Sequence, residues 1–217
     1  MTSEESLPRA VMKNDMHTVH RLLEGGASTE WNGEDERDYY EHAAGIWLSL
    51  TPADGDYEGM LDLLISYGAN LNPDRGVPAL HGAIQLAARH GADVTISRID
   101  SLISRGANIN HIGDIGPGIM PMPFRGSPLH AYYGSGHQVA ETLLQRGADT
   151  NIRDSDGRDA QAFFLAYKEK AQSEHEEIDL ILESINRLSR NGGSGAGASD
   201  VKGIRKPSPF WKKLLGR

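Results

Sequence analysis

The stretch that decides the fold runs Ala140-Glu141-Thr142-Leu143-Leu144-Gln145-Arg146-Gly147-Ala148-Asp149-Thr150-Asn151. Its apolar residues recur at helical spacing and so predict a helix with one buried face. Gly147 follows the last helical turn, where it supplies the left-handed conformation that ends a helix at little cost. The Asp and Asn after it suit a tight turn, because their short side chains bond local backbone.

The same arrangement occurs three more times along the chain. The copies read Val19-His20-Arg21-Leu22-Leu23-Glu24-Gly25-Gly26-Ala27, Leu61-Asp62-Leu63-Leu64-Ile65-Ser66-Tyr67-Gly68-Ala69-Asn70-Leu71-Asn72 and Ile99-Asp100-Ser101-Leu102-Ile103-Ser104-Arg105-Gly106-Ala107-Asn108-Ile109-Asn110. Two copies have a second signature upstream, Pro78-Ala79-Leu80-His81 and Ser127-Pro128-Leu129-His130, in which Pro fits the first turn of another helix. Each unit is therefore expected to contain two helices.

This pattern resembles the ankyrin repeat, which opens with Thr-Pro-Leu-His and closes with Leu-Leu, two residues, Gly-Ala-Asp, one residue and Asn. The best-matching unit opens at Gly126 and closes through Asp154. The resemblance covers roughly residues 7 to 188 and implies an all-α ankyrin-repeat solenoid of about five helix–loop–helix units with long finger loops. The units are expected near residues 7–30, 38–72, 76–110, 126–151 and 157–188.

The units are longer than the family pattern. Gly-Ala pairs begin at positions 26, 68, 106 and 147 and so lie 42, 38 and 41 residues apart, whereas the family repeat has about 33 residues. The insertions are expected mainly in loops: a long connection at 51–56 in a second unit that opens near Asp38, and an irregular finger at 112–125. The third unit is expected to lengthen its first helix or the following loop around residues 90–93, whose Gly-Ala-Asp is interpreted as a loop and not as a repeat end. The fifth unit lacks the Gly-Ala finish and is expected to be a terminal cap.

The composition changes abruptly after Arg190. Residues 191–205 are rich in Gly, Ser and Ala, which predicts a flexible linker. A basic aromatic tail peptide follows at residues 206–217 and contains Phe210, Trp211, Lys212, Lys213, Leu214 and Leu215. Residues 192–217 carry a net charge of +5, which leaves −13 for the other 191 residues of a chain whose formal charge is −8. The acidic array is therefore not expected to bind nucleic acid.

Several classes of chemistry find no support in the sequence. The chain has no cysteine, which excludes disulfides and cysteine-based metal sites. The acidic start and the absence of a run of 18 apolar residues predict a soluble, cytoplasmic protein. The resemblance implies that His81 and His130 bond backbone at helix starts. We find no catalytic or metal-ligand motif, and we expect a protein that is not an enzyme and uses no cofactor or metal.

The resemblance implies that the concave face of the fingers and first helices binds another protein, as an adaptor, inhibitor or immunity-type binder. The partner-binding residues expected there are Trp31, Arg37, Tyr39, Asp74, Arg75, Met120, Met122, Phe124, Arg125, Tyr132, Tyr133, Arg153 and Arg158. Two of these groups have an alternative role. The two tyrosines either line the groove or fill space left by a neighbour. The two methionines and Phe124 alternate with prolines, and they either seal the neighbouring finger or contact the partner.

A second hypothesis concerns the tail. Its aromatic and cationic residues suit a tether to a membrane surface or to another acidic partner, with the array as a scaffold. The segment is short and favours only weak, reversible adsorption, so partner binding by the array is preferred. The tail can also fold back on the acidic array or dock on a neighbouring copy, because the linker has ample reach.

Overall fold

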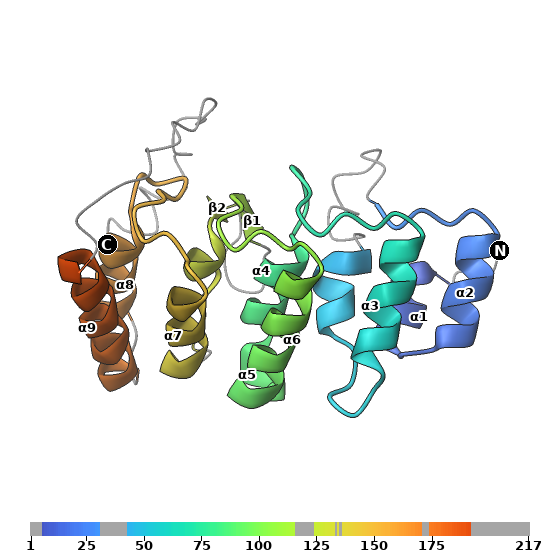
Figure 1. Ribbon diagram of the computed structural model, residues 1–217, viewed down its shortest axis with the longest axis horizontal. Helices are drawn as coiled ribbons and strands as arrows, with labels where there is room; N and C mark the ends of the chain where they lie inside the picture. The colour runs from blue at the N-terminus through green and yellow to red at the C-terminus, as the bar shows by residue number, and fades with distance from the viewer. Residues whose placement is uncertain are drawn as a thin grey trace.

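A computed structural model describes residues 6–30, 43–115, 124–132, 134, 136–170 and 174–191. Helices dominate this part of the chain (Figure 1). The helical segments are α1 (Leu7–Met12), α2 (Met16–Glu24), η2 (Ala43–Trp47), α3 (Tyr57–Ser66), α4 (Ala79–Gln85), α5 (Ala87–His90), α6 (Ala92–Ser104), η3 (Pro128–Ala131), α7 (His137–Gln145), α8 (Ala160–Lys168) and α9 (His175–Asn191). Two short strands, β1 (Gly113–Ile115) and β2 (Phe124–Gly126), interrupt the series.

The helices follow one another along the long axis of the molecule in two rows (Figure 1). The first row contains α1, η2, α4, η3 and α8, each of which contacts the next. The second row contains α2, α3, α6, α7 and α9, and α7 contacts both α6 and α9. Each first-row element also contacts the second-row helix that follows it in the chain. The chain therefore zigzags between the rows.

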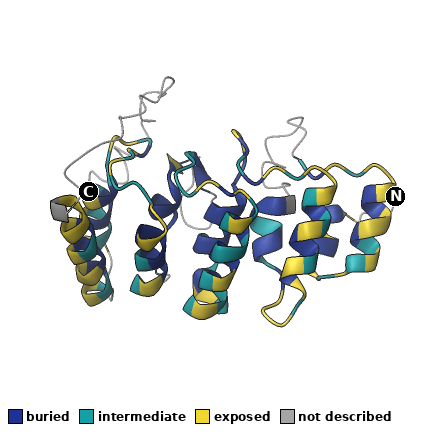
Figure 2. Ribbon diagram, viewed as in Figure 1, coloured by how far each residue is buried: buried dark blue, intermediate teal, exposed yellow. Residues whose placement is uncertain are grey.

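The hydrophobic core lies between the two rows (Figure 2). The helices turn their apolar stripes inward, because an amphipathic helix gains stability mainly by burying that face. The largest fully buried side chains come from both rows: Leu48, Met60, Leu61, Leu64, Leu80, Ile84, Ile99, Leu102, Leu129, Leu143, Phe164 and Ile178.

Four second-row helices end in the same way. A glycine with φ between +87° and +96° follows each of α2, α3, α6 and α7, and the four are Gly26, Gly68, Gly106 and Gly147. The next residue is Ala, whose N–H donates to a Leu carbonyl five residues earlier at 2.9–3.0 Å. This is the Schellman arrangement, in which glycine adopts a left-handed conformation at no steric cost. The predicted glycine stops are confirmed at all four positions.

Side chains also connect each of these turns to the next. Asn72 donates from Nδ2 to the Gly106 carbonyl at 2.9 Å and accepts from the Asn108 N–H at 2.7 Å. Asn110 repeats the pattern on the following turn, with Gly147 O at 3.3 Å and the Asp149 N–H at 2.7 Å. In the first turn, Glu30 accepts from the Asn70 N–H at 2.6 Å. The sequence predicted only local bonds for these residues, whereas the structure shows that they also join successive units.

The first row is less regular than predicted. The helix expected after Pro128 is a single 3₁₀ turn, because Tyr132 is extended and Gly134 and Gly136 have positive φ, which no right-handed helix accommodates. The loop expected at 90–93 is also wrong. Gly91, with φ 84° and ψ 164°, separates α5 from α6, and Ala92 and Asp93 already belong to α6.

The predicted connection at 51–56 does separate two helical segments, and a buried arginine holds it. Arg98 on α6 is 4% exposed. Its guanidinium donates to the carbonyls of Ser49, Thr51 and Pro52 at 2.7, 2.8 and 3.2 Å, and it lies 4.6 Å from the centre of the Tyr57 ring. These carbonyls take the place of a carboxylate as hydrogen-bond partners of the buried cation.

The last helix pair has both buried and exposed apolar side chains. Phe163 and Phe164 on α8 and Ile178, Ile181 and Ile185 on α9 are buried. Leu180 on α9 is instead 46% exposed. Two more leucines of this pair are also exposed, Leu165 at 48% and Leu188 at 41%.

Candidate protein-binding surface

The finger before η3 is built on a short antiparallel hairpin. In the register of β1 and β2, Gly113 faces Gly126, Asp114 faces Arg125, and Ile115 faces Phe124. Both glycines allow close packing at the base of the hairpin. A Cβ at position 113 would lie 2.2 Å from Pro78 Cγ, and one at position 126 would lie 2.6 Å from His130 Cβ.

Asp114 and Arg125 join this hairpin to the preceding finger. The buried Asp114 carboxylate accepts from the Gly76 N–H at 2.9 Å, and its other oxygen lies 3.4 Å from Arg125 Nε. Arg125 Nη2 donates to the carbonyls of Asp74 and Ile112 at 3.2 and 3.0 Å. The guanidinium therefore bridges the two fingers while its side chain remains 46% exposed.

The next finger, at residues 153–158, joins the same hairpin from the other side. The Ser155 N–H donates to the Arg125 carbonyl at 2.8 Å. Asp154 is buried and accepts from the backbone N–H groups of Asp156 and Arg158 and from Arg158 Nε, at 2.8–2.9 Å. Because these bonds close the finger on itself, its backbone is fixed before any partner arrives.

His81 and His130 bond backbone, as the resemblance implied, and they tie the fingers to the first row. His81 is fully buried and donates from Nε2 to the Gly126 carbonyl at 2.9 Å. His130 Nδ1 accepts from the Ser127 N–H at 3.2 Å, and its Nε2 donates to the Arg158 carbonyl at the same distance. Burial lowers the pKa of His81 to about 3 and also lowers the pKa of His130. Both rings are therefore neutral structural groups at pH 7.

Five of the predicted partner-binding residues lie along these connected fingers. Asp74, Arg75 and Arg153 are exposed, and so is Arg125. Arg158 is partly buried, with its guanidinium between Asp154 and Asp156. We call this set, residues 74, 75, 125, 153 and 158, the finger row. It runs along one edge of the molecule, above the helices in Figure 1.

Two predicted residues do not lie on the surface. Phe124 is 3% exposed and stacks on Phe163, with the ring centres 6.3 Å apart. Tyr132 is also 3% exposed, and its ring meets Phe164 edge-on at 5.2 Å. Each ring fills space against α8, so neither is available to a partner. The sealing role is the one the structure supports for both.

The other predicted residues lie outside the described part of the chain. They are Trp31, Arg37, Tyr39, Met120, Met122 and Tyr133 in the array and Phe210, Trp211, Lys212, Lys213, Leu214 and Leu215 in the tail. The predicted start of the second unit near Asp38 and residues 192–217 lie outside it as well.

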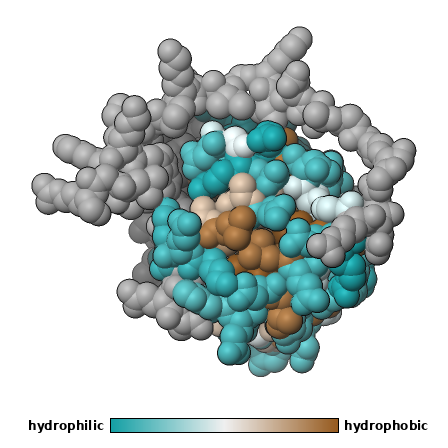
Figure 3. Space-filling view, turned by 90° about the vertical axis from the view of Figure 1, so that its left-hand side faces the viewer, coloured by the Kyte–Doolittle hydropathy of each residue, from teal (hydrophilic) through white to brown (hydrophobic). Residues whose placement is uncertain are grey.

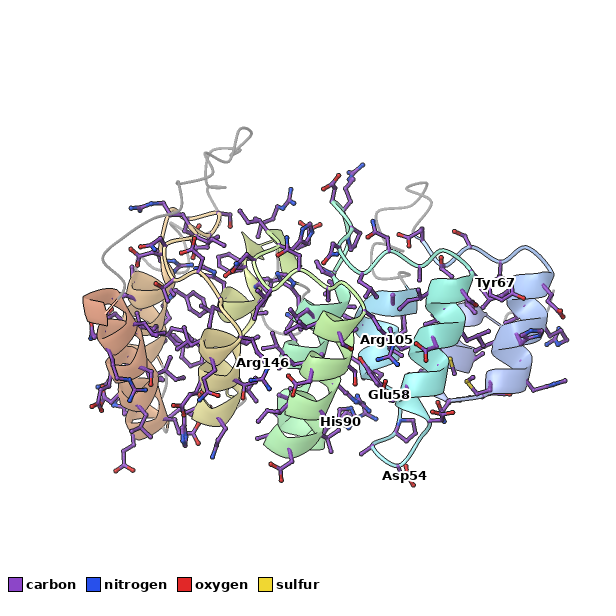
Figure 4. All side chains as sticks on the ribbon, in the orientation of Figure 1. Asp54, Glu58, Tyr67, His90, Arg105 and Arg146 are labelled. Atoms are coloured by element: carbon purple, nitrogen blue, oxygen red, sulfur yellow. The ribbon has the colours of Figure 1, made fainter. Side chains whose placement is uncertain are left out.

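A series of ion pairs that sequence reasoning missed links the second-row helices (Figure 4). Arg105, the C-cap of α6, lies 2.6 Å from both Glu58 and Asp62 on α3. Arg146, the C-cap of α7, pairs through two nitrogens with Asp100 on α6 at 2.9 Å. The signal was present in the sequence, because each arginine directly precedes the glycine of its turn.

No group of three His, Asp or Glu side chains is arranged to hold a metal ion among the described residues. No helix in that part of the chain combines the length and apolar character needed to cross a membrane.

Comparison with known proteins identifies one segment. The ankyrin-repeat family model matches residues 126–155, which include the end of β2, η3, α7 and the glycine turn that follows it. A comparison with curated proteins gives no match. The matched segment carries the Ser-Pro-Leu-His opening and the Gly-Ala-Asp-Thr-Asn close, and it is an ankyrin repeat.

Proposed function

We propose that this chain binds a partner protein through the finger row. Ankyrin repeats generally mediate interaction between proteins, and they typically do so without catalysing a reaction. The observation that carries the proposal is the bonding of three consecutive fingers through Arg125, which leaves charged side chains exposed on a fixed backbone. A surface that is ordered before binding loses less conformational entropy on association.

The proposal includes the extent of the array. Five units near residues 7–30, 38–72, 76–110, 126–151 and 157–188 account for the alternation of first-row and second-row elements. Because α9 includes Asn191, residues 192–205 would then connect the array to a separate tail at 206–217. An array of this kind presents its fingers along one edge, so that a partner can contact several units at once.

The chemistry of the finger row favours a partner with carboxylates at the contact. Arg75 and Arg153 are exposed, and Arg125 keeps nearly half of its side chain accessible. Arginine recognises carboxylates through paired N–H donors and is enriched where protein interfaces carry most of their binding energy. Binding through such contacts should weaken as ionic strength rises.

The experiment is capture from the native source with the full chain as bait, followed by affinity measurement with the purified partner. Arg75→Glu combined with Arg153→Glu should weaken binding by at least tenfold, because two charges change sign at the contact. A circular dichroism spectrum and an unfolding midpoint close to those of the parent would show that the array is intact.

The matched control reverses two charges at the opposite edge. Lys13, which follows α1, and Arg89 on α5 are exposed. In Figure 1 the α1–α2 connection and α5 lie at the end of the helices away from the fingers. Lys13→Glu with Arg89→Glu changes the net charge by the same amount and should leave affinity nearly unchanged. If both double variants bind as the parent does, or both lose affinity equally, the finger row is not the contact surface.

A further inference from the structure

The outer side of the last helix pair, at the C-terminal end of the array, exposes an apolar area. Figure 3 shows this end of the molecule, where hydrophobic side chains gather in the middle of a hydrophilic surround. Leu165 on α8 is 48% exposed, and the half-buried Ala162 and Ala166 lie beside it on the same helix. In a repeat array, this is the face on which a further helix pair would stack.

Two contacts between the helices locate Leu165 on this face. Gln161 Nε2 on α8 donates to Asn186 Oδ1 on α9 at 3.3 Å. Two turns further along α8, Lys168 Nζ pairs with Asp179 on α9. Leu165 lies between Gln161 and Lys168 at helical spacings of four and three, so it shares their face. The same rule places Leu182 between Asp179 and Asn186 on α9. We call the face made by these residues the terminal face.

The rim of the terminal face is acidic. Glu169, the C-cap of α8, follows Leu165 by one turn, and Asp179 and Glu183 are one turn apart on α9. All three are exposed. Lys168 is the basic residue on this rim, and it already pairs with Asp179. Residues 174–183 as a whole contain five carboxylates and no Lys or Arg. A ligand for this face therefore needs apolar side chains together with positive charge.

We propose that the tail peptide, residues 206–217, docks on the terminal face of its own chain. It has Phe210, Trp211, Leu214 and Leu215 for the apolar centre and Lys206, Lys212, Lys213 and Arg217 for the acidic rim. The apolar side chains gain by leaving water, and the cations gain from nearby carboxylates.

The connection has the length that this docking requires. Fourteen residues, 192–205, separate the end of α9 from Lys206. A Gly/Ser-rich chain of that length spans about 20 Å on average, whereas α9, with its 17 residues, extends for about 25 Å. The tether therefore reaches the middle of the terminal face, and its effective concentration there is in the millimolar range.

A second copy of the array is a poorer occupant of this face. Two terminal faces placed end to end would bring their acidic rims together, and the chain without residues 192–217 carries a net charge of −13. Like charges in contact oppose such an association. The finger row presents exposed arginines and so does not compete for the basic tail. The docking does not depend on the proposed function, because it uses a different face.

The test is paramagnetic relaxation in the full chain. The protein has no cysteine, so Ser208→Cys carries a single nitroxide label. We expect the label to broaden the amide signals of residues 161–168 and 179–186 and to leave those of α2 sharp. Leu165→Asp, or Lys212→Glu with Lys213→Glu in the tail, should remove the broadening. The tail variant carries no risk to folding of the array.

The control is Leu180→Asp. Leu180 on α9 is 46% exposed, but it lies two turns from Arg187, on the side of α9 that pairs with Glu141 on α7, and so faces away from the terminal face. This variant should keep the broadening. A sample that mixes labelled chains with unlabelled ¹⁵N chains reports docking between molecules. The proposal is overturned if broadening occurs only in the mixture, is absent or uniform along the array, or persists in the tail variant.

Discussion

The glycine turns of this array keep one geometry from unit to unit, whereas its first-row helices differ in length and regularity. The four turns share one backbone geometry and connect to one another through Asn72 and Asn110. The first row contains a kinked segment at η2, a helix of only seven residues at α4, and a single turn at η3. Because the turns keep the spacing of the units, the first row and its loops absorb the extra residues.

The largest effect should come from the core, where the two rows can be compared directly. Leu143 on α7 and Leu129 on η3 are both 1% exposed. Leu143→Ala should destabilise the fold by about 2 to 5 kcal/mol, since a regular helix cannot close the cavity. Leu129→Ala should cost less, because a single turn can shift inward. Urea unfolding followed by circular dichroism measures both; an equal or larger cost at Leu129 would contradict the difference between the rows.

The next effect is a loss of stability in mild acid through the first row. The pKa of His81 is about 3 in the fold and about 6.5 in an unfolded chain. The unfolded chain therefore binds the proton first, so this stability is present above pH 6.5 and is lost as the pH falls. At pH 5 the loss from His81 is about 2 kcal/mol, and His130 shifts stability in the same direction.

Unfolding midpoints at pH 7.5 and pH 5 test this expectation. His81→Gln keeps an N–H that can donate to the Gly126 carbonyl but does not titrate, so its stability should change much less between the two pH values. If the parent and the variant lose the same stability, buried histidine is not the cause.

A smaller effect is expected in the row of turns. Asn110→Ala removes the two hydrogen bonds to the following turn and should cost roughly 1 kcal/mol, because the released backbone groups stay partly accessible to water. Asn151→Ala is the matched control, since the Asn151 side chain bonds only within its own turn, to Asp149 at 3.0 Å. Equal costs for the two variants would mean that bonds between the turns do not hold the units together.

The smallest effect should come from the ion pairs of the second row. Arg146 and Asp100 are 41% and 44% exposed, and exposed pairs contribute at most about 1 kcal/mol. A double-mutant cycle with Ala at both positions measures the coupling. We expect it to fall further at 1 M salt. A coupling well above that value would mean that these ion pairs stabilise the array as much as the hydrogen bonds between the turns do.

The sequence predicted the features that depend on local chemistry. Gly147 was recognised because a helix stop with positive φ favours glycine, and His130 because its motif fixes its position at the start of η3. The sequence left two roles open for Phe124 and Tyr132, since their burial depends on Phe163 and Phe164 of α8, 39 and 32 residues further along the chain. The bond between Asn110 and Gly147 was missed for the same reason, because a single turn does not reveal what its neighbour offers.

The base of the β1–β2 hairpin is closed on every side. Gly113 packs on Pro78, Gly126 packs on His130, and the Gly126 carbonyl accepts from His81. These contacts fix where the chain leaves and re-enters the array, independently of the residue types between positions 116 and 123. That interval is consequently suited to the insertion of foreign peptides. Loops of other lengths placed there should leave the fold of the helical array unchanged.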